Sequence, residues 1–460
     1  MDSAKPTTLR TIHVASLLVL IFVSSSKTIF TSFAAAANQA QNSQWKPKSS
    51  GSSAVFPVQG NVYPDGVYTV ALKIGKRPQP YTLDIDTGSD LTWLQCDAPC
   101  VSCTKKPPDL YKPYNNFVRC NDAICTAVQT NKNDPCADAQ GQCDYEVKYV
   151  DQGTSLGVLV ADNFQLQFSN GSRLSPRLVF GCGYDQQLPN SQNPPITDGV
   201  LGLGAGKSSI VSQLQEMGLT GHVFGHCFSG QGGGFLFFGD KIVPSLGVIW
   251  VPMASTGHSI DTHYSLGPAE LLFDGHSTGA KGLLMIFDSG SSYTYFNAIA
   301  YQAALSAVRK GLSGKPLKDA VEDQSLPICW KSAKPFKSVQ DVKSYFKPLQ
   351  LKYFKTKNAQ LEIPPEAYLV ITKHGNVCLG ILNGTEVGLD SLNVIGDNFF
   401  QDKLVVYSNE KQQIGWTSAN CNWPPLDDQV YSDGAPQPDA DALSLLNEYS
   451  SATRGWRDEL

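Results

Sequence analysis

Two short stretches decide how this sequence folds: Leu83-Asp84-Ile85-Asp86-Thr87-Gly88-Ser89 and Leu284-Met285-Ile286-Phe287-Asp288-Ser289-Gly290-Ser291. Each is an apolar run, typical of a β-strand, that ends in Asp, a hydroxyl residue, Gly and Ser. Asp288 follows Asp86 by 202 positions. One copy alone would be typical of an ordinary turn after a strand, because Asp, Gly and Ser are common turn residues.

Each copy is followed by a second shared feature, a short apolar run that ends in glycine. Gly199-Val200-Leu201-Gly202 ends 116 positions after Asp86, and Asn393-Val394-Ile395-Gly396 ends 108 positions after Asp288. A turn repeated by chance would not bring a downstream partner with it at a similar spacing. The sequence therefore predicts two copies of one β unit.

The repeat has a chemical meaning if the two turns meet across a two-fold axis, so that Asp86 and Asp288 face each other. Adjacent carboxylates repel when both are ionised, so the pair holds one proton and titrates as a unit. One carboxylate then acts as general base toward a water, while the protonated one donates to a substrate carbonyl. Gly88 and Gly290 allow the tight turns. Four hydroxyl residues are available to orient the carboxylates: Thr87, Ser89, Ser289 and Ser291.

Composition limits the class of protein. The chain has 460 residues, of which 42% are hydrophobic and 10% aromatic, so it has room for two large domains with a substantial core. Its net charge is -5 and no run is rich in Lys or Arg, which argues against a nucleic-acid partner. From residue 56 onward, short β-rich runs alternate with Gly and Pro, which indicates a mostly β, mainly antiparallel protein.

Particular runs predict particular elements. Strands are expected at Val67–Ile74, Tyr81–Ile85, Tyr145–Val150 and Phe235–Phe238, and helices at Ser209–Glu216 and Ala298–Lys310. We expect an N-terminal β lobe over 57–245 that contains a cysteine-rich insertion, and a C-terminal β lobe over 246–425. A cleft between the lobes would receive one aspartate from each.

The two ends of the chain differ from the rest. Lys5 and Arg10 precede an apolar run from Val14 to Val23, which is typical of an export signal within 1–37. A membrane anchor is the alternative, but this run is short for a span of about 20 residues. We expect a linker or short pro-segment over 38–56, an acidic flexible tail over 426–460, and no stable membrane insertion once the signal is removed.

Twelve cysteines are many for a cytosolic protein, and seven lie between Cys96 and Cys143. Zinc is the weaker explanation, because no His occurs between His13 and His222 and the spacings do not form two matched pairs. We therefore expect six disulfides, no free thiol and no metal. Asn170 and Asn383 begin glycosylation sequons, which matter if the chain is secreted.

Two further patterns favour ordinary structural roles. The glycine-rich stretch 202–208 has some likeness to a phosphate-binding loop, but Leu201 stands where that loop needs Gly, so a turn into a short helix is expected. His222 and His226 lie four apart without the Glu of a metalloprotease motif between them, so both are expected to be structural.

The sequence from about 56 to 423 closely resembles the pepsin-like aspartic proteases. The stretches 56–66 and 91–100 are similar to the plant nucellin-like and nepenthesin-like group. The resemblance implies a bilobal fold of two pseudo-symmetric β lobes and an aspartic endopeptidase that acts on polypeptide substrates. We expect no cofactor, since two carboxylates and a water suffice for the reaction, and we expect a monomer.

The resemblance also implies roles for individual residues. Asp86 and Asp288 match the catalytic pair, Tyr149 matches the tyrosine of the flap that covers the substrate, and Trp93 matches the tryptophan behind it. The flap sequence departs from the family pattern, because 149–155 contains Val150 and one extra residue. Two disulfides are implied, one joining Cys329 to Cys378 within the C-terminal lobe and one joining Cys182 to Cys421 between the lobes.

Two questions stay open at this level. A catalytically inactive pepsin-like binding protein or enzyme inhibitor is the alternative function, although such proteins typically have damaged catalytic motifs and both motifs here are intact. The final compartment is the other question. The ending Arg457-Asp458-Glu459-Leu460 differs at one position from a signal for retention in the endoplasmic reticulum, whereas the extracellular space or the vacuole is the ordinary outcome of secretion.

Overall fold

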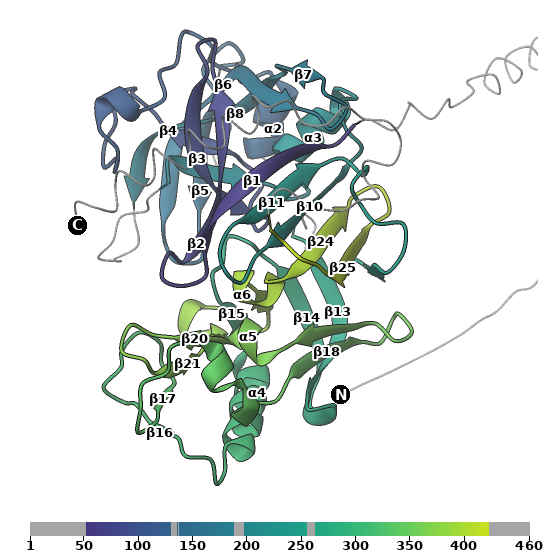
Figure 1. Cartoon of the computed structure of the whole chain (residues 1–460). Helices are drawn as coiled ribbons and strands as arrows, with labels where there is room; N and C mark the ends of the chain where they lie inside the picture. The colour runs from purple at the N-terminus through teal and green to yellow at the C-terminus, as the bar shows by residue number, and fades with distance from the viewer. Residues whose placement is uncertain (1–51, 130–135, 137, 188–196, 255–262, 423–460) are drawn as a thin grey trace, which may run out of the picture. The chain divides into compact units, whose positions relative to one another are not determined.

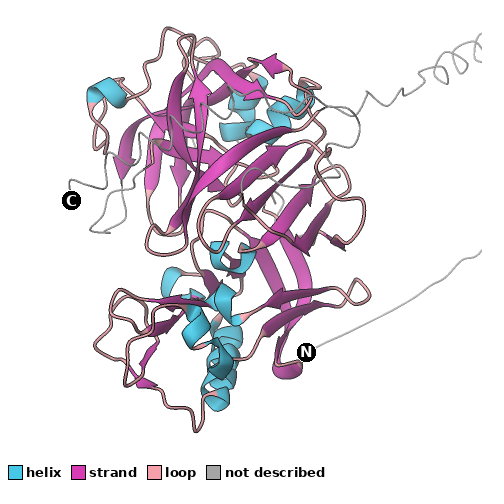
Figure 2. Cartoon of the chain, viewed as in Figure 1, coloured by secondary structure: helices cyan, strands magenta, loops and turns pink. Residues whose placement is uncertain are grey.

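The computed structural model of the chain describes residues 52–129, 136, 138–187, 197–254 and 263–422. Strands form most of its regular structure and the helices are few, as Figure 2 shows. The prediction of a mostly β protein is confirmed. The expected export signal (1–37) and acidic tail (426–460) lie outside the described residues, and so does the expected linker except for 52–56.

The largest sheet has fourteen strands. In spatial order they are β12 (Ile249–Pro252), β25 (Gln413–Ser418), β24 (Lys403–Ser408), β10 (Val223–Phe228), β11 (Gly234–Phe238), β1 (Ala54–Asn61), β2 (Val67–Ile74), β3 (Gln79–Asp86), β9 (Gly199–Gly202), β4 (Trp93–Gln95), β8 (Arg177–Gln187), β6 (Thr154–Gln167) and β5 (Asp144–Lys148), with β7 (Arg173–Leu174) paired to β6. Most neighbours are antiparallel, but β3 pairs with β9, and β4 with β8, in parallel.

This sheet combines strands from both halves of the chain. β10 pairs with β24, which in turn pairs with β25, and β25 pairs with β12. Figure 1 shows the yellow-green β24 and β25 beside the teal β10. Because β12, β24 and β25 all follow residue 245, the sequence on either side of that position contributes to one continuous set of hydrogen bonds.

Two smaller sheets belong to the second half. The first has the order β19 (Gln360–Ile363), β18 (Leu349–Tyr353), β13 (Ser265–Phe273), β14 (His276–Phe287), β23 (Asn393–Ile395), β15 (Thr294–Phe296) and β22 (Ile381–Asn383). The second has the order β16 (Lys318–Asp319), β17 (Cys329–Lys331), β21 (Val377–Leu379) and β20 (Leu369–Ile371). β14 runs parallel to β23, just as β3 runs parallel to β9. The predicted repeat of one β unit is confirmed by these two matching strand pairs.

The helices are few, and two of them begin with a side-chain cap. They are α2 (Ala123–Gln129), α3 (Ile210–Glu216), α4 (Ala298–Gly311), α5 (Pro365–Tyr368) and α6 (Asp397–Phe400), with 3-10 turns at Pro107–Asp109, Val339–Asp341, Lys343–Tyr345 and Gly384–Val387. The side chain of Ser209 accepts a hydrogen bond from Ser212 N and begins α3, and that of Asn297 does the same for α4 through Ala300 N. Both helices predicted from sequence are confirmed to within one residue. None of the helices in the described ranges is long and apolar enough to span a membrane.

One hydrophobic cluster reaches the strands that end at the two aspartates. Ile85 of β3 and Phe287 of β14 are both fully buried members of it. His226 of β10 is also fully buried and stacks on Phe228, with ring centroids 4.2 Å apart. Burial lowers the pKa of His226 to about 3, so the ring is neutral. A structural role fits this packing, as the sequence indicated.

All twelve cysteines are described, and all form disulfides. The six pairs are Cys96–Cys182, Cys100–Cys103, Cys120–Cys136, Cys125–Cys143, Cys227–Cys421 and Cys329–Cys378. The expected number of bridges and the expected Cys329–Cys378 pair agree with the structure. Cys329 and Cys378 lie directly opposite each other on β17 and β21, which explains their pairing.

The expected bridge between Cys182 and Cys421 is wrong. Cys182 of β8 pairs in register with Leu94 of β4. Cys96 lies two residues after Leu94 and forms the disulfide with Cys182. Cys421 follows β25 and instead meets Cys227 on β10, which the pairing of β10 with β24 places nearby. The bridge to Cys421 therefore starts from β10 rather than β8.

Candidate active site

Asp86 is the last residue of β3, and the turn that follows it holds its carboxylate. The N–H of Gly88 donates a hydrogen bond to Asp86 Oδ1 at 2.8 Å, and the hydroxyl of Ser89 donates to Asp86 Oδ2. Asp86 pairs in register with Gly202 of β9, so the downstream glycine of the repeat lies beside it. Asp86 is 6% exposed, which places a carboxyl group in a largely dehydrated position.

Asp288 follows β14 and has the same set of contacts. The N–H of Gly290 donates to Asp288 Oδ1 at 2.9 Å, and the hydroxyl of Ser291 donates to Asp288 Oδ2 at 2.8 Å. Its own N–H donates to the carbonyl of Ile395 at the end of β23. Asp288 is half-buried. The two turns are thus built alike, down to the atoms that hold each carboxylate.

The two turns face each other closely. A Cβ at Gly88 would lie 2.5 Å from Asp288 Oδ1, and a Cβ at Gly290 would lie 2.6 Å from Asp86 Oδ1. No residue other than glycine fits either position without displacing a carboxylate. Each carboxylate therefore lies against the backbone of the opposite turn, which is the face-to-face arrangement that the repeat predicted for Asp86 and Asp288.

Thr87 and Ser289 hold the turns together through four hydrogen bonds. The Thr87 hydroxyl donates to the carbonyl of Phe287 at 2.9 Å and accepts from the N–H of Ser289 at 3.0 Å. The Ser289 hydroxyl donates to the carbonyl of Ile85 at 2.7 Å and accepts from the N–H of Thr87 at 3.1 Å. Sequence reasoning offered these hydroxyls to the carboxylates. The structure instead uses them to join the two strands behind the pair, while Ser89 and Ser291 contact the carboxylates.

The close pair changes the acidity of the site. Burial, and then the negative charge of Asp288, raise the pKa of Asp86 to about 7. The hydrogen bonds from Ser89 and Gly88 act in the opposite direction but are smaller. The proton that the pair retains can therefore stay in place through the acid range. Such a pair can supply a base and an acid at the same time.

Tyr149 and Trp93, the two residues matched to the flap, contact each other. Tyr149 lies in the turn between β5 and β6, and its hydroxyl accepts a hydrogen bond from Trp93 Nε1 at 2.7 Å. The extra residue of the turn is Gln152, whose φ of 71° is left-handed, with the N–H of Gln152 bonded to the carbonyl of Tyr149. The turn closes with Tyr149 N–H donating to Gly153 O at 2.9 Å. The departure from the family pattern is thus accommodated inside the hairpin turn.

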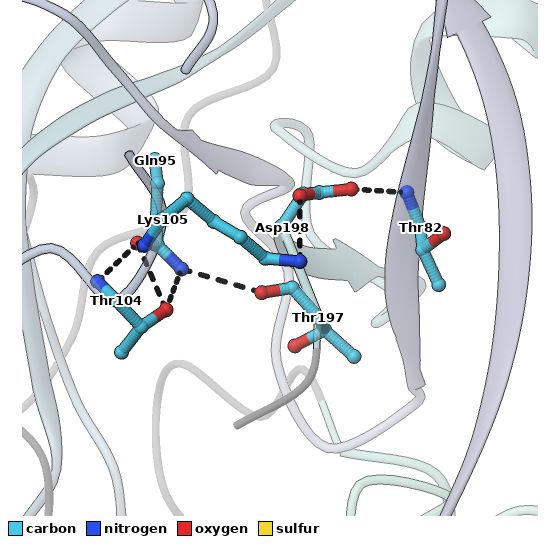
Figure 3. A network of polar contacts seen from close by, with 6 residues as sticks. All are labelled: Thr82, Gln95, Thr104, Lys105, Thr197 and Asp198. Carbon is cyan, nitrogen blue, oxygen red and sulfur yellow. Dashed lines mark hydrogen bonds and ion pairs between the residues drawn. The ribbon is translucent and has the colours of Figure 1, made fainter. Parts of the chain in front are cut away.

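The polar network in Figure 3 anchors the cysteine-rich insertion to the strands that carry the site. Lys105 Nζ lies 3.3 Å from Asp198 Oδ1, and Asp198 Oδ2 accepts from the N–H of Thr82 on β3. Gln95 Oε1 of β4 accepts a hydrogen bond from the N–H of Thr104 at 2.8 Å, and Gln95 Nε2 donates one to the carbonyl of Thr197. β3 is therefore fixed at Thr82, four residues before Asp86.

Two carboxyl groups near the pair, one half-buried and one fully buried, were missed by the sequence analysis. Asp84 lies two residues before Asp86 on β3, and Asp397 begins α6 directly after Gly396. Burial, together with the neighbouring carboxylates, raises the pKa of both groups well above the usual range. Each has a buried oxygen without a hydrogen-bond partner among the described residues. The signal for Asp84 was its spacing, because alternate residues of a strand share a face.

The remaining predicted site residues lie elsewhere. Asn170 is exposed and its side chain accepts from the hydroxyl of Ser172. Asn383 begins a 3-10 turn and accepts from the hydroxyl of Thr385. In both sequons the asparagine thus contacts the hydroxyl that defines the motif. The cysteines that lie close enough together to suggest metal ligands are all engaged in disulfides.

Known proteins resemble this chain over most of its length. The family described as xylanase inhibitor N-terminal matches residues 68–240, and the family described as xylanase inhibitor C-terminal matches residues 265–418. An aspartic proteinase of Oryza sativa subsp. japonica is 45% identical over 383 residues, which cover 81% of this chain and 92% of that protein. Aspartic proteinase nepenthesin-1 of Nepenthes gracilis is 26% identical and is covered over 80% of its length, by 79% of this chain.

Solved structures show the same fold at lower identity. Basic 7S globulin from soybean has a TM-score of 0.63 at 19% identity, covering 84% of this chain and 97% of that one. Conglutin gamma from lupine seeds has a TM-score of 0.62 at 18% identity, covering 80% of this chain and 96% of that one. The fold is therefore the bilobal, mostly β pepsin-like fold. From its identity to the rice proteinase over most of both chains, this chain belongs to the plant family of pepsin-like aspartic proteases.

Proposed function

We propose that the chain is an aspartic endopeptidase that hydrolyses peptide bonds of polypeptide substrates through a water activated by Asp86 and Asp288. The arrangement of these two carboxyl groups is the observation that carries the proposal. Each is held by a glycine N–H and a serine hydroxyl of its own turn, and each lies against the glycine of the other turn.

The reaction follows from a pair that shares one proton. The ionised carboxylate takes a proton from water as the water oxygen attacks the carbonyl carbon, and the protonated carboxyl gives its proton to the carbonyl oxygen. The product is a neutral tetrahedral diol. The carboxyl that gained a proton then delivers it to the leaving nitrogen, the C–N bond breaks, and a diol hydroxyl returns its proton to the other carboxylate. One water is consumed, and the pair ends as it began.

The surrounding residues support this chemistry. The four hydrogen bonds of Thr87 and Ser289 fix the spacing of the two turns, and positioning of this kind accounts for a large part of enzymatic rate enhancement. Tyr149, held by Trp93, would close over a bound peptide and exclude bulk water. We also propose that the substrate lies between the two lobes, whose boundaries we place at 57–245 and 246–425.

We further propose that the protein passes through the secretory pathway. Six disulfides favour an oxidising compartment, since such bonds are rare in the reducing cytosol. Exposed Asn170 would then carry a glycan, as would Asn383 at the start of its turn. Removal of Arg457 to Leu460 tests the final address: a larger secreted fraction supports retention in the endoplasmic reticulum, and an unchanged fraction supports the extracellular space or the vacuole.

An inhibitor titration tests the proposed function. The full chain, expressed through the secretory pathway, should digest denatured protein between about pH 3 and 6, because the pair must keep its single proton. A peptide with a hydroxyl-bearing carbon in place of the scissile carbonyl mimics the diol and should abolish digestion at one equivalent per chain. Digestion that persists with the inhibitor bound, or that requires a metal ion, would contradict the proposal.

A further inference from the structure

Two adjoining cavities lie in the N-terminal half of the chain, apart from the aspartate pair. They measure about 240 and 230 Å³, and Lys76, Tyr114 and Asp162 line both of them. Gln79, which lines the first cavity, is the first residue of β3, and Asp86 is the last residue of the same strand. Because a strand advances about 3.3 Å per residue, the cavities and the pair are about 20 Å apart. The proposed reaction does not involve them.

The linings of the two cavities carry an excess of positive charge. Lys76 lines both, Arg77 and Lys112 line the first. Arg177 lines the second. All four residues are exposed, and none forms an ion pair with another described residue. Asp162 is the one carboxylate among the described lining residues, so the net charge of the linings is +3, in a chain whose net charge is -5. A concave surface lined by unpaired charges of one sign attracts ligands of the opposite sign.

The backbone that carries these cations is fixed by strand pairing. The N–H of Gly75 donates to the carbonyl of Asn163 on β6 at 2.9 Å, and Asn163 pairs in register with Arg177 of β8. Asp162 is 5% exposed, and its carboxylate accepts hydrogen bonds from the Tyr111 hydroxyl and the Asn163 N–H, both at 2.8 Å. This carboxylate therefore belongs to the framework of the cavities, and the exposed cations are left for a ligand.

The uncharged lining groups are suited to a sugar. Tyr114 is 65% exposed, and the apolar face of such a ring can pack against the C–H groups of a sugar ring. The side-chain amides of Gln79, Asn115 and Asn163 form no hydrogen bond with any described residue. An amide both donates and accepts, which matches a sugar hydroxyl. A phosphate or sulfate ion alone offers neither a ring to the tyrosine nor a set of hydroxyls to the amides.

We propose that the two cavities bind an acidic oligosaccharide, with the carboxylates of uronic-acid rings on the cations and a ring face against Tyr114. The pair of cavities favours a ligand of repeating units. Arg77 and Lys112 belong to one cavity and Arg177 to the other, so each can receive a carboxylate of its own. Charge-assisted hydrogen bonds join Lys and Arg to carboxylates, and Arg can form two parallel bonds with one carboxylate.

Binding at this place would attach the protein to an acidic polysaccharide. The cavities lie near the start of β3 and the aspartate pair lies at its end, so a bound saccharide leaves the pair accessible. Because the cations are exposed, dissolved salt screens their attraction for the carboxylates. The affinity for an acidic saccharide should therefore fall as salt is added, whereas the affinity for a neutral saccharide should not.

A matched pair of ligands tests the assignment. The probe is a fluorescently labelled tetramer of galacturonic acid, and its methyl-esterified form is the control, which keeps the rings but lacks the charges. Binding of each to the full chain is measured by fluorescence polarisation at about pH 6, where carboxylates of this kind are ionised. We expect the acid to bind at least about tenfold more tightly than the ester, since a hydrogen bond to a charged group contributes at least this factor.

Three variants locate the binding. The double variant Arg77→Gln, Lys112→Gln should lower the affinity for the acid at least about tenfold and leave that for the ester nearly unchanged. The double variant Lys355→Gln, Lys357→Gln removes the same charge from the exposed turn between β18 and β19 and should change neither affinity. Tyr114→Ala should weaken both ligands alike, by about threefold or more. All five residues are exposed, and circular dichroism verifies that each variant is folded.

The results can overturn the assignment in several ways. Equal binding of acid and ester by the wild type, or an acid preference that survives in the Arg77, Lys112 variant, would show that these cations receive no carboxylate. An equal loss in the Lys355, Lys357 variant would mean that net charge alone attracts the ligand. A glutamate tetramer that binds as tightly as the acidic sugar, or a Tyr114→Ala variant with unchanged affinities, would exclude a saccharide site. Because binding is the readout, the outcome does not depend on peptide hydrolysis.

Discussion

Replacing Thr87 by Val removes the hydrogen bonds that join the two active-site turns while nearly conserving volume. Thr87 is completely buried, and its hydroxyl contacts the Phe287 carbonyl and the Ser289 N–H at 2.9 and 3.0 Å. Val can make neither bond, so two buried backbone groups lose a partner. Since each such loss costs about 1–3 kcal/mol, we expect the free energy of unfolding to fall by about 2–6 kcal/mol.

Thr87→Ser is the matched control, because it keeps the hydroxyl and loses only a methyl group, at a cost of about 1 kcal/mol. Both variants are compared with the wild type by equilibrium urea unfolding at pH 5 with the disulfides intact, followed by tryptophan fluorescence. The same samples are assayed for kcat/KM. We expect a loss of about a hundredfold in the Val variant, because a displaced turn misplaces its carboxylate.

The comparison can refute the reasoning. If Thr87→Val unfolds at the same urea concentration as Thr87→Ser, the two hydrogen bonds do not hold the turns together. If the Val variant is destabilised but retains full kcat/KM, the bonds serve stability alone and do not position the carboxylates.

Three further predictions concern the flap, the acid group and the disulfides. Tyr149→Phe leaves the Trp93 N–H without its acceptor, and we expect kcat/KM to fall about tenfold in a peptide assay; an unchanged value would contradict the flap contact. Because the pKa of Asp86 is raised to about 7 in the folded protein, this carboxyl ionises more readily in the unfolded chain, and the wild type loses stability as the pH rises from about 4 to 7. Asp86→Asn lacks this ionisation, so it should gain stability relative to the wild type over that range. A pH-independent difference in urea unfolding would argue against that pKa. Replacing Cys227 and Cys421 by Ser opens a link across 194 residues and should lower the unfolding free energy by about 5 kcal/mol at most, and a non-reducing peptide map should also join Cys96 to Cys182.

The strand-and-turn units could be predicted because their signals are local. The apolar run before Asp86 and the glycine after it specify a strand and a tight turn, and the repeat at Asp288 identifies the same unit again. The clearer of the two helices could be predicted because Tyr301, Leu305 and Val308 share one apolar face, and all three are buried in α4. The face-to-face placement of the two aspartates followed from the repeat rather than from either copy alone.

The cysteine pairing could not be predicted, because it depends on which strands are neighbours. Cys96 reaches Cys182 only because β4 runs parallel to β8, and Cys421 reaches Cys227 only because β24 adds to β10. No spacing in the sequence specifies either contact. The continuity of the large sheet across the two halves of the chain was missed for the same reason.

Asp84 shows a different limit of sequence reasoning. Its two-residue spacing from Asp86 was present in the sequence, but a single acidic residue in a strand does not indicate a particular role. The register of β3 with β9 places Asp84 beside Val200, which pairs with Trp93 of β4, and Asp84 Oδ1 has no hydrogen-bond partner among the described residues. Contacts of this kind become visible once neighbouring strands are known.

The central claim is that the two carboxyl groups carry out peptide hydrolysis in different protonation states. The most direct test is kcat/KM on one peptide substrate at acid pH for the wild type, Asp86→Asn and Asp288→Asn, with Asp274→Asn as the charge-matched control and circular dichroism to verify the fold. We predict a loss of at least about a thousandfold in either active-site variant and none in the control. If either Asn variant keeps more than a few per cent of wild-type activity, the paired-carboxylate account is contradicted.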